Sequence, residues 1–325
     1  LTSDAYFRGG LIRQNGNIYV GYTPNDPRND TRGDARLAKL DKNGSRYWVE
    51  AIDDTKDDVR TLDVAVDTNN GRIYAAGGND TTASGPGHGF LHAYPDRNNN
   101  QKPDWEKKTT SVVKNEAVEV ESDSGHIFTV GSDNGDVFLD RRNLKGEGVA
   151  NWPVIIGKSS GRQTGTDLAI DHKRDRIYVV GSTVRTFGGE SFAGKHDGYI
   201  AAIGMDGKRK WLRIVGTPDA DTFVAVDVRQ RDGAIFVTGR TTGSLGGAKK
   251  ESNGDAFIAR YSPDGNQKHL EVRGDPGASD RGNDVVADEE TDDVYVTGQT
   301  EGNFGCESCN TIGKRDLFMW RVRLP

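Results

Sequence analysis

Short runs of apolar and β-branched residues recur along the chain at a nearly constant interval. The clearest run combines Ile or Val, an aromatic residue, a second β-branched residue, Gly and Thr, as in "RIYVVGST" at 176–183. The spacing between runs averages about 55 residues, close to the periods of blade-type repeats. Six such runs begin at Asn17, Arg72, His126, Arg176, Ala234 and Asp293. The recurrence predicts one structural unit repeated six times.

Three further short runs accompany each copy. An apolar run precedes it, such as "DLAID" at 167–171. Two runs follow it, such as "DGYIAAI" at 197–203 and "KWLRIVG" at 210–216. Turn residues separate the runs, and no segment keeps an apolar period of 3.6 residues. We therefore expect an antiparallel meander of four strands in each unit, and no helices.

A four-stranded meander with two apolar faces cannot bury both faces by itself, but a ring of such sheets can. The sequence therefore predicts an all-β fold, a single β-propeller domain over residues 1–325 with about six four-stranded blades. The last unit has room for three strands only, so we expect a strand from Leu1–Tyr6 to complete it, unless further blades lie outside this chain. The expected blades are 1–53, 54–109, 110–157, 158–216, 217–274 and 275–325.

Composition excludes some partners. The net charge is −6 and the basic residues are scattered, which argues against nucleic-acid binding. No apolar stretch approaches the roughly 20 residues that span a bilayer, so we expect no membrane insertion.

The chain begins at Leu1 without a visible signal peptide, and we interpret it as processed or as one part of a longer chain with flanking domains. Cys306 and Cys309 would form a local disulfide in an exported protein, or otherwise stay free thiols.

The combination "AVD…G.IYV.G.T…DAFIARYSPDG" resembles the bacterial-type SBBP repeats, which are named for a seven-bladed β-propeller. The resemblance is clearest over 165–325 and fades over 110–157 and 1–53. It implies a secreted or cell-surface propeller, with the periplasm as an alternative location, and often one module of a larger protein. In addition, "DKNGSRYW" at 41–48 looks like the tryptophan-docking turn of quinoprotein propellers.

Candidate ligand-binding residues fall into two groups. Asp63, Asp167 and Asp284 open the first strand of their units, and we expect them near the mouth of the propeller channel, where they would bind a ligand or an ion or, alternatively, cap the strand. Phe187 and Phe304 lie in long Gly-rich loops, where binding often resides. The favoured alternative is that these rings and Leu245 fasten each loop to its own blade. By contrast, we expect the acids that end the first strand to accept hydrogen bonds from turn N–H groups; these are Asp67, Glu121, Asp171, Asp227 and Asp288.

The segment "DRNNNQKPDW" at 96–105 has the spacing of an oxygen-ligand calcium loop. Gln101 stands where such loops need Gly, and Lys107 where they need Glu, so a plain polar turn is the competing interpretation. Calcium is therefore a candidate cofactor. The expected ligands are Asp96, Asn98, Asn100 and Asp104, with the carbonyl of Lys102.

The chain has no nucleophile elbow, no P-loop and no credible Cys/His pair. We therefore favour a secreted or surface module that binds a protein or a glycan through its loop-rich face. One alternative is a carbohydrate-active enzyme, a lyase or glycosidase, with acidic groups at the channel mouth. The other is a structural spacer in a larger surface protein.

Overall fold

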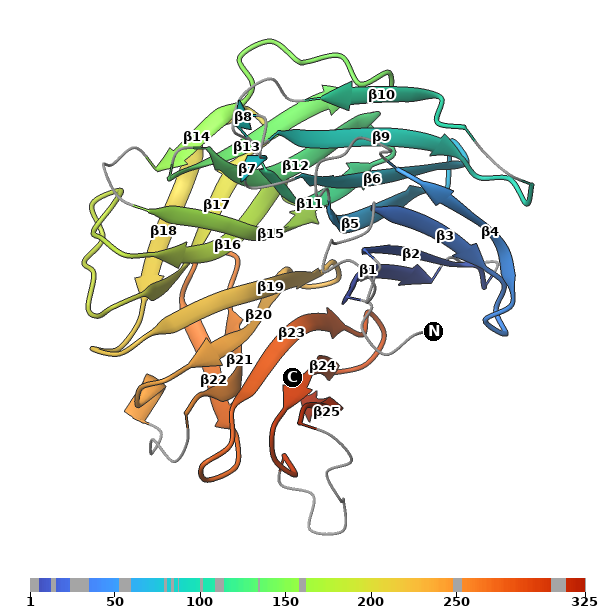
Figure 1. Cartoon of the computed structure of the whole chain (residues 1–325). Helices are drawn as coiled ribbons and strands as arrows, with labels where there is room; N and C mark the ends of the chain where they lie inside the picture. The colour runs from blue at the N-terminus through green and yellow to red at the C-terminus, as the bar shows by residue number, and fades with distance from the viewer. Residues whose placement is uncertain are drawn as a thin grey trace. The chain divides into compact units, whose positions relative to one another are not determined.

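Six antiparallel sheets follow one another along the chain, which confirms the all-β prediction (Figure 1). Within the described residues, the one helical element is the short 3-10 turn η1 (Leu245–Gly247). The computed structural model describes residues 6–12, 16–23, 35–52, 60–78, 81–82, 85–86, 88–99, 102–108, 114–133, 135–157, 162–247, 253–304 and 314–324.

The first compact unit, Leu1–Ile155, contains three sheets, called blades 1 to 3. Blade 1 consists of β1 (Tyr6–Ile12), β2 (Ile18–Thr23), β3 (Arg36–Leu40) and β4 (Arg46–Ala51). Blade 2 consists of β5 (Arg60–Asp67), β6 (Arg72–Gly78), β9 (Gly89–Pro95) and β10 (Trp105–Lys108), with the ribbon β7 (Thr81–Thr82) and β8 (Gly85–Pro86) between β6 and β9. Blade 3 consists of β11 (Lys114–Glu121), β12 (His126–Asp133), β13 (Asp136–Asn143) and β14 (Val154–Gly157).

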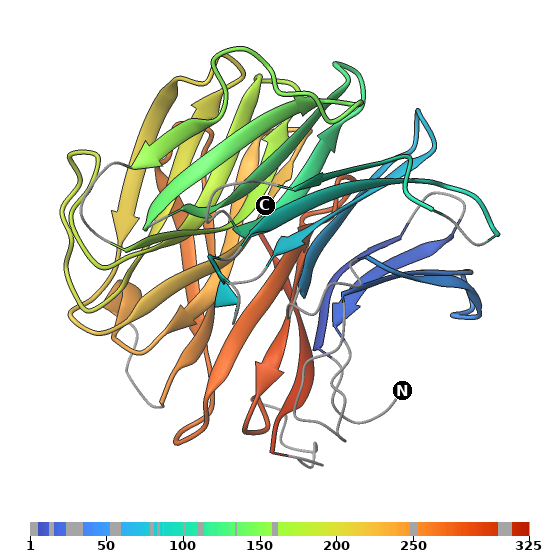
Figure 2. The ribbon, with the colours of Figure 1, turned by 45° about the horizontal axis from the view of Figure 1, so that its top comes forward.

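The second compact unit, Ile156–Pro325, contains blades 4 to 6. Blade 4 consists of β15 (Gln163–Asp171), β16 (Arg176–Thr183), β17 (Asp197–Gly204) and β18 (Arg209–Val215). Blade 5 consists of β19 (Asp221–Arg229), β20 (Ala234–Thr241), β21 (Asp255–Tyr261) and β22 (Gln267–Arg273). Blade 6 shows β23 (Asp280–Ala287), β24 (Asp293–Thr300) and β25 (Asp316–Arg323) among the described residues. Figures 1 and 2 show these sheets of the second unit side by side in chain order.

The strand that begins at Tyr6 belongs to blade 1, where Tyr6 pairs with Thr23. Residues 1–5 lie outside the described residues. Completion of blade 6 by the N-terminal segment therefore stays a prediction, and so does the assignment of residues 1–325 to a single domain.

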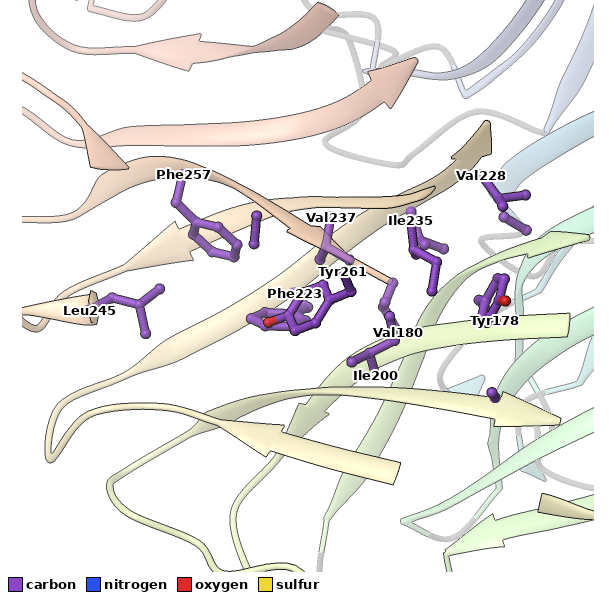
Figure 3. Packing of buried hydrophobic residues seen from close by; sticks show 14 residues of the cluster. Tyr178, Val180, Ile200, Phe223, Val228, Ile235, Val237, Leu245, Phe257 and Tyr261 are labelled. Atoms are coloured by element: carbon purple, nitrogen blue, oxygen red, sulfur yellow. The ribbon is translucent and has the colours of Figure 1, made fainter. Parts of the chain in front are cut away.

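Both faces of blade 5 are apolar, and each packs against a different neighbour. On one face, Phe223, Val237 and Phe257 join a cluster that includes Tyr178 and Ile200 of blade 4 (Figure 3). On the other face, a second cluster joins this blade to blade 6. Adjacent residues such as Val237 and Phe236 enter different clusters because successive side chains of a strand point to opposite faces. The alternation explains why the repeat has apolar residues at consecutive positions of its second strand. Members of the second cluster include Phe236, Ile258, Val285, Val296 and Trp320.

The Gly of the repeated run is required by a β-bulge in the facing strand. In all six blades the pairing between the first and second strands shifts register at one place. In blade 5 the shift lies between Phe223 and Ala225, and Gly239 pairs with Phe223. A Cβ at Gly239 would lie 2.0 Å from the carbonyl oxygen of Thr222, and one at Gly181 would lie 1.8 Å from that of Thr164. Only glycine fits opposite the bulge.

Tryptophans on the fourth strand tie a blade to the next one within each unit. In unit 1, Trp48 donates from Nε1 to the carbonyl of Arg97 at 2.9 Å, which is the docking that "DKNGSRYW" suggested. In unit 2, Trp211 donates to the carbonyl of Pro263 at 2.9 Å. The indole of Trp211 also covers Gly265, where an added Cβ would meet the ring at 2.9 Å. The tryptophan position therefore serves contact between blades.

Replacing the glycine opposite the bulge should destabilise the fold. The variant Gly239→Ala places a methyl group against the Thr222 carbonyl, and overpacking of this kind costs about 2–3 kcal/mol. Urea unfolding followed by fluorescence should show a lower midpoint. Gly148→Ala is the matched control, because nothing lies within 4 Å of its added Cβ. Equal midpoints for Gly239→Ala and the wild type would contradict the bulge argument.

Candidate functional site

The loops at one end of the blades in unit 2 are joined into a continuous surface, called the loop face. It comprises the described residues of the loops between second and third strands (184–196, 242–247 and 253–254) and of the loops between blades (216–220 and 274–279). Backbone hydrogen bonds run from Asp221 N to the His196 carbonyl at 2.7 Å and from Thr242 N to the Ala220 carbonyl at 2.8 Å. Loop 216–220 is thus held on both sides by neighbouring loops.

The same arrangement repeats one blade further on. Asp280 N donates to the Gly254 carbonyl at 2.7 Å, and Glu301 N donates to the Ser279 carbonyl at 3.1 Å. Parallel β-bridges between His196 and Ala220, and between Gly254 and Ser279, add to these contacts. Repetition shows that the joining is built into the repeat.

Fully buried aspartates hold the loop face from below. The carboxylate of Asp221 accepts hydrogen bonds from Thr217 N at 2.6 Å and from the hydroxyl groups of Thr217 and Thr241. Asp197, which opens the third strand of blade 4, accepts a hydrogen bond from Ala193 N at 2.6 Å. Burial raises the pKa of Asp197, and the nearby Asp221 raises it further. These carboxylates are 0% exposed, so they fasten loops and cannot reach a substrate outside.

A second carboxylate pair lies between blades 5 and 6. Burial raises the pKa of Asp280, and Asp275 and Asp255 add to the shift. A Cβ at Gly274 would lie 2.1 Å from Oδ1 of Asp255 and 2.9 Å from Oδ2 of Asp280, so both carboxylates face this glycine. From the sequence, Asp221, Asp275 and Asp280 were noted only as acids of the loops between blades, and their pairing with Asp197 and Asp255 was not foreseen. Such a pair can be recognised in the sequence. One Asp stands at the start of the third strand of a blade, and the other stands at the start of the first strand of the following blade.

The apolar loop residues are buried anchors. Phe187 is 3% exposed and packs edge-on against Tyr199 at 5.2 Å between ring centroids. Phe304 is 7% exposed and stacks on Phe318 at 3.7 Å. Leu245 lies in the cluster between blades 4 and 5. This placement agrees with the alternative in which these apolar residues fasten the loops to the blades. Ligand binding by Phe187 and Phe304 stays a prediction.

The aspartates that open the first strand bond across to the next blade. Asp63 accepts hydrogen bonds from Val64 N and from Val118 N of blade 3. Asp167 likewise accepts from Leu168 N and from Val226 N of blade 5. Each carboxylate therefore links two blades through peptide N–H groups.

Asp284 accepts a hydrogen bond from Val285 N at 2.8 Å, and desolvation raises its pKa. In each of these first strands the acid is the first paired residue after the β-bulge. The three acids are Asp63, Asp167 and Asp284. The structure gives these three residues a common backbone position in separate blades. Ligand or ion binding by them stays a prediction.

Four of the five strand-end acids accept hydrogen bonds from turn N–H groups, as expected. Asp67 accepts from Asn69 N and Asn70 N, and Asp288 accepts from Glu290 N and Thr291 N. Glu121 accepts from Ser124 N, and Asp171 accepts from Arg174 N.

Asp227 is the exception, and its grouping with the turn acids was wrong. The strand β19 continues to Arg229, two residues further than the repeat alignment placed its end. The carboxylate of Asp227 accepts from Val228 N and from Ala287 N of blade 6, both at 2.8 Å. Asp227 therefore belongs with the acids that link blades.

The candidate calcium segment is organised around a lysine side chain. Nζ of Lys39 lies 2.8 Å from Oδ1 of Asp96 and donates to Oδ1 of Asn98 at 2.6 Å. Asp96 also accepts a hydrogen bond from the Tyr19 hydroxyl. Asp104 pairs instead with Arg72 at 3.0 Å. Lys39 thus contacts two of the residues that were expected to bind calcium, Asp96 and Asn98.

Other parts of the calcium prediction are untested. Asn100 lies outside the described residues, and the role of the Lys102 carbonyl stays a prediction. Among the described residues, no group of three acidic, His or Cys side chains could hold a metal ion. Calcium binding stays a prediction, which a melting scan with and without a chelator would test.

Two further features can be placed only in part. Cys306 and Cys309 lie outside the described residues. In the part of the chain that is described, no helix has the length and apolar character needed to cross a membrane.

Removal of the Lys39 ammonium should strongly destabilise unit 1. Lys39 and Asp96 are 2% and 1% exposed, and Lys39→Met leaves the carboxylate buried without its ion pair. Loss of one partner of a buried pair costs about 3–5 kcal/mol. Urea unfolding should show this loss, whereas Arg72→Met, which breaks the partly exposed pair with Asp104, should cost less than about 1 kcal/mol. Equal costs for the two variants would refute the role of Lys39.

The linking acid Asp227 should make stability depend on pH. Burial raises the pKa of Asp227 in the folded state, so the folded protein binds a proton that the unfolded chain releases. The unfolding free energy of the wild type should therefore rise relative to Asp227→Asn as pH falls from 7 through the folded pKa. Urea titrations at several pH values measure this difference. Asp288→Asn is the control, because turn N–H groups lower the pKa of Asp288 and its contribution changes only in more acidic solution. A pH-independent difference for Asp227→Asn would contradict the argument.

Comparison with solved structures supports the fold. A prolyl endopeptidase matches 98% of this chain at 11% identity and a TM-score of 0.52, and this chain spans 42% of the length of that protein. The β-propeller domain of the Trilobed protease from Pyrococcus furiosus matches 98% of this chain and 82% of its own at 14% identity, with a TM-score of 0.51. An α-L-arabinofuranosidase from Fusarium graminearum matches 99% of this chain and 94% of its own at 11% identity, with a TM-score of 0.58. At such identities the likeness shows the propeller fold alone.

Comparison by sequence identifies the repeat. No curated protein matches the sequence. Residues 274–305 match the family model SBBP, described as a β-propeller repeat. This range contains β23 and β24, the first two strands of blade 6. The resemblance found from the repeated motif is thereby confirmed, and the chain is a β-propeller protein that carries an SBBP repeat.

Proposed function

We propose that the chain is a binding module that recognises a protein or a glycan through its loop face. The observation that carries the proposal is the way in which the loops of unit 2 are joined. Each loop between blades is bonded to the loops on both sides, and buried aspartates fix it from below. Rigid loops lose little conformational entropy on binding, which favours recognition.

The exposed side of the loop face is polar. The side chain of Lys195 is 72% exposed beside Asp219, and Arg185, Thr186 and His196 are exposed on the same loop. The rings of Phe187 and Phe304 are buried beneath this surface as anchors. Such a surface offers hydrogen-bonding and charged groups to a hydrophilic partner, as suits a glycan or the polar rim of a protein.

A carbohydrate-active enzyme is the second candidate. A glycosidase needs two carboxylates roughly 5–10 Å apart that reach one open cleft. The paired carboxylates below the loop face are buried and bonded to the backbone, which favours binding over catalysis at this surface. In this proposal the module acts outside the cell or at its surface, as the SBBP resemblance implies. A role as a structural spacer predicts that the loop face has no ligand.

A loop-face variant should lose ligand binding without losing stability. Arg185→Ser with Lys195→Ser removes two exposed positive charges from the loop face. On an array of glycans and extracellular proteins, we expect the wild type to bind one ligand class and the variant to bind it at least 10-fold more weakly. The matched control, Lys173→Ser with Lys208→Ser, removes two exposed positive charges from turns at the opposite end of blade 4 and should bind normally.

The outcomes separate the three functions. Loss of binding in the control variant but not in the loop variant would refute the loop face as the site. Release of reducing sugar or unsaturated products from a bound polysaccharide would favour the enzyme. Absence of any bound ligand over the whole array would favour the spacer.

A further inference from the structure

A cavity of about 260 Å³ lies within blade 5, at the end opposite the loop face. It is bounded by the turn between the first and second strands, by the turn between the third and fourth strands, and by the start of β22. This volume is below the roughly 300–1,000 Å³ of pockets that hold drug-sized ligands, so its occupant is a smaller molecule. The lining residues are Asp232, Ala234, Arg260, Tyr261, Ser262, Pro263 and Lys268.

The cavity has an excess of positive charge. Nε of Arg260 is buried and has no hydrogen-bond partner among the described residues. Lys268 is exposed at the entrance. The one carboxylate of the lining, Asp232, is held from behind by the buried Arg229, with Nη2–Oδ2 at 2.7 Å and Nε–Oδ1 at 3.2 Å. Partial burial raises the pKa of Asp232, but the hydrogen bond from Arg229 and the nearby charges of Arg229 and Arg260 lower it overall. The two lining cations still outnumber the one lining carboxylate, and Nε of Arg260 has no hydrogen-bond partner among the described residues.

Blade 1 shows how a cation at this position of the repeat is satisfied. Arg260 pairs with Phe236 of the second strand, and Lys39 of blade 1 pairs in the same register with Tyr19. The ammonium of Lys39 binds the Asp96 carboxylate and the amide oxygen of Asn98. The position thus binds carboxylate oxygen where the chain supplies it. In blade 5 a cavity adjoins the corresponding cation.

The walls of the cavity are fixed before any ligand binds. Arg174 donates from Nη2 to the Asp232 carbonyl at 2.8 Å, and Ala234 N donates to Oδ1 of Asp232 at 3.0 Å. On the other wall, the Pro263 carbonyl accepts hydrogen bonds from Arg176 at 2.6 Å and from Trp211 at 2.9 Å. A preorganised cavity avoids part of the entropy cost of binding.

We propose that this cavity binds the carboxylate of a small hydroxy acid of the size of one sugar ring, such as a uronate. Arg260 and Lys268 bind the carboxylate, because charge-assisted hydrogen bonds are about twice as strong as neutral ones. Asp232 and Ser262 accept hydrogen bonds from hydroxyl groups of the ligand. Because Asp232 can only accept hydrogen bonds, it favours a ligand with several hydroxyl groups, so a hydroxy acid is preferred over phosphate or sulfate. The site goes beyond the loop-face function, since it lies at the other end of the blade.

Isothermal titration with glucuronate tests the proposal. We expect the wild type to bind glucuronate, to bind glucose at least 10-fold more weakly, and to lose affinity as salt is raised. Arg260→Gln should weaken glucuronate binding at least 10-fold, and Lys268→Gln about 3-fold. Lys210→Gln is the matched control, because Lys210 has the same place near the start of the fourth strand in blade 4, pairs there with Asp206, and does not line the cavity.

Several outcomes would overturn the assignment. Absence of heat with glucuronate at millimolar concentration would refute the site. Unchanged affinity in Arg260→Gln, or equal losses in Lys268→Gln and Lys210→Gln, would place the ligand elsewhere. Binding of inorganic phosphate or sulfate as tightly as glucuronate would refute the preference for a hydroxy acid. If Arg260→Gln does not fold, Lys268→Gln still tests the site, because Lys268 is exposed and its substitution leaves the buried packing intact. The loop-face variant should bind glucuronate as the wild type does.

Discussion

A sheet with apolar side chains on both faces needs a neighbour on each side, and this requirement governs the structure of each compact unit. Blade 5 meets it by dividing adjacent residues, such as Phe236 and Val237, between two separate clusters. Burial of apolar area is the main favourable term in such packing. It has no direction of its own, so it does not fix how one blade is aligned with the next.

Alignment comes from polar groups placed at the edges of these clusters. Asp63, Asp167 and Asp227 accept hydrogen bonds from peptide N–H groups of two blades at once. Trp48 and Trp211 reach carbonyls of the following blade from the outer strand. Hydrogen bonds depend on distance and angle, so each of them excludes other alignments. Acidic residues in this protein therefore serve largely as internal acceptors.

This use of carboxylates shapes what the surface can do. The acids below the loop face hold the loops in place, which leaves recognition to the side chains above them. At one position of the third strand, blades 1 and 5 both carry a cation that needs an acceptor. Lys39 finds its oxygen ligands within the chain, whereas Arg260 adjoins a cavity. A single repeat position thus stabilises one blade and gives another a candidate site for an anionic ligand.

The sequence by itself determined the number of sheets, the expected meander of four strands in each, and the SBBP resemblance. These features follow from short apolar runs, from the turn residues between them and from a repeated motif. It also identified Asp67 and Asp288 as turn acceptors, since their partners lie within three residues. It misjudged Asp227, because an alignment of short runs does not show the bulge that sets the register of β19. Only the tertiary structure decided that Lys39 would lie against Asp96 and Asn98, that Phe187 and Phe304 would face inward, and that a cavity would adjoin Arg260. These contacts join residues far apart in the chain, and their geometry depends on how whole sheets pack, which no local pattern of residues records.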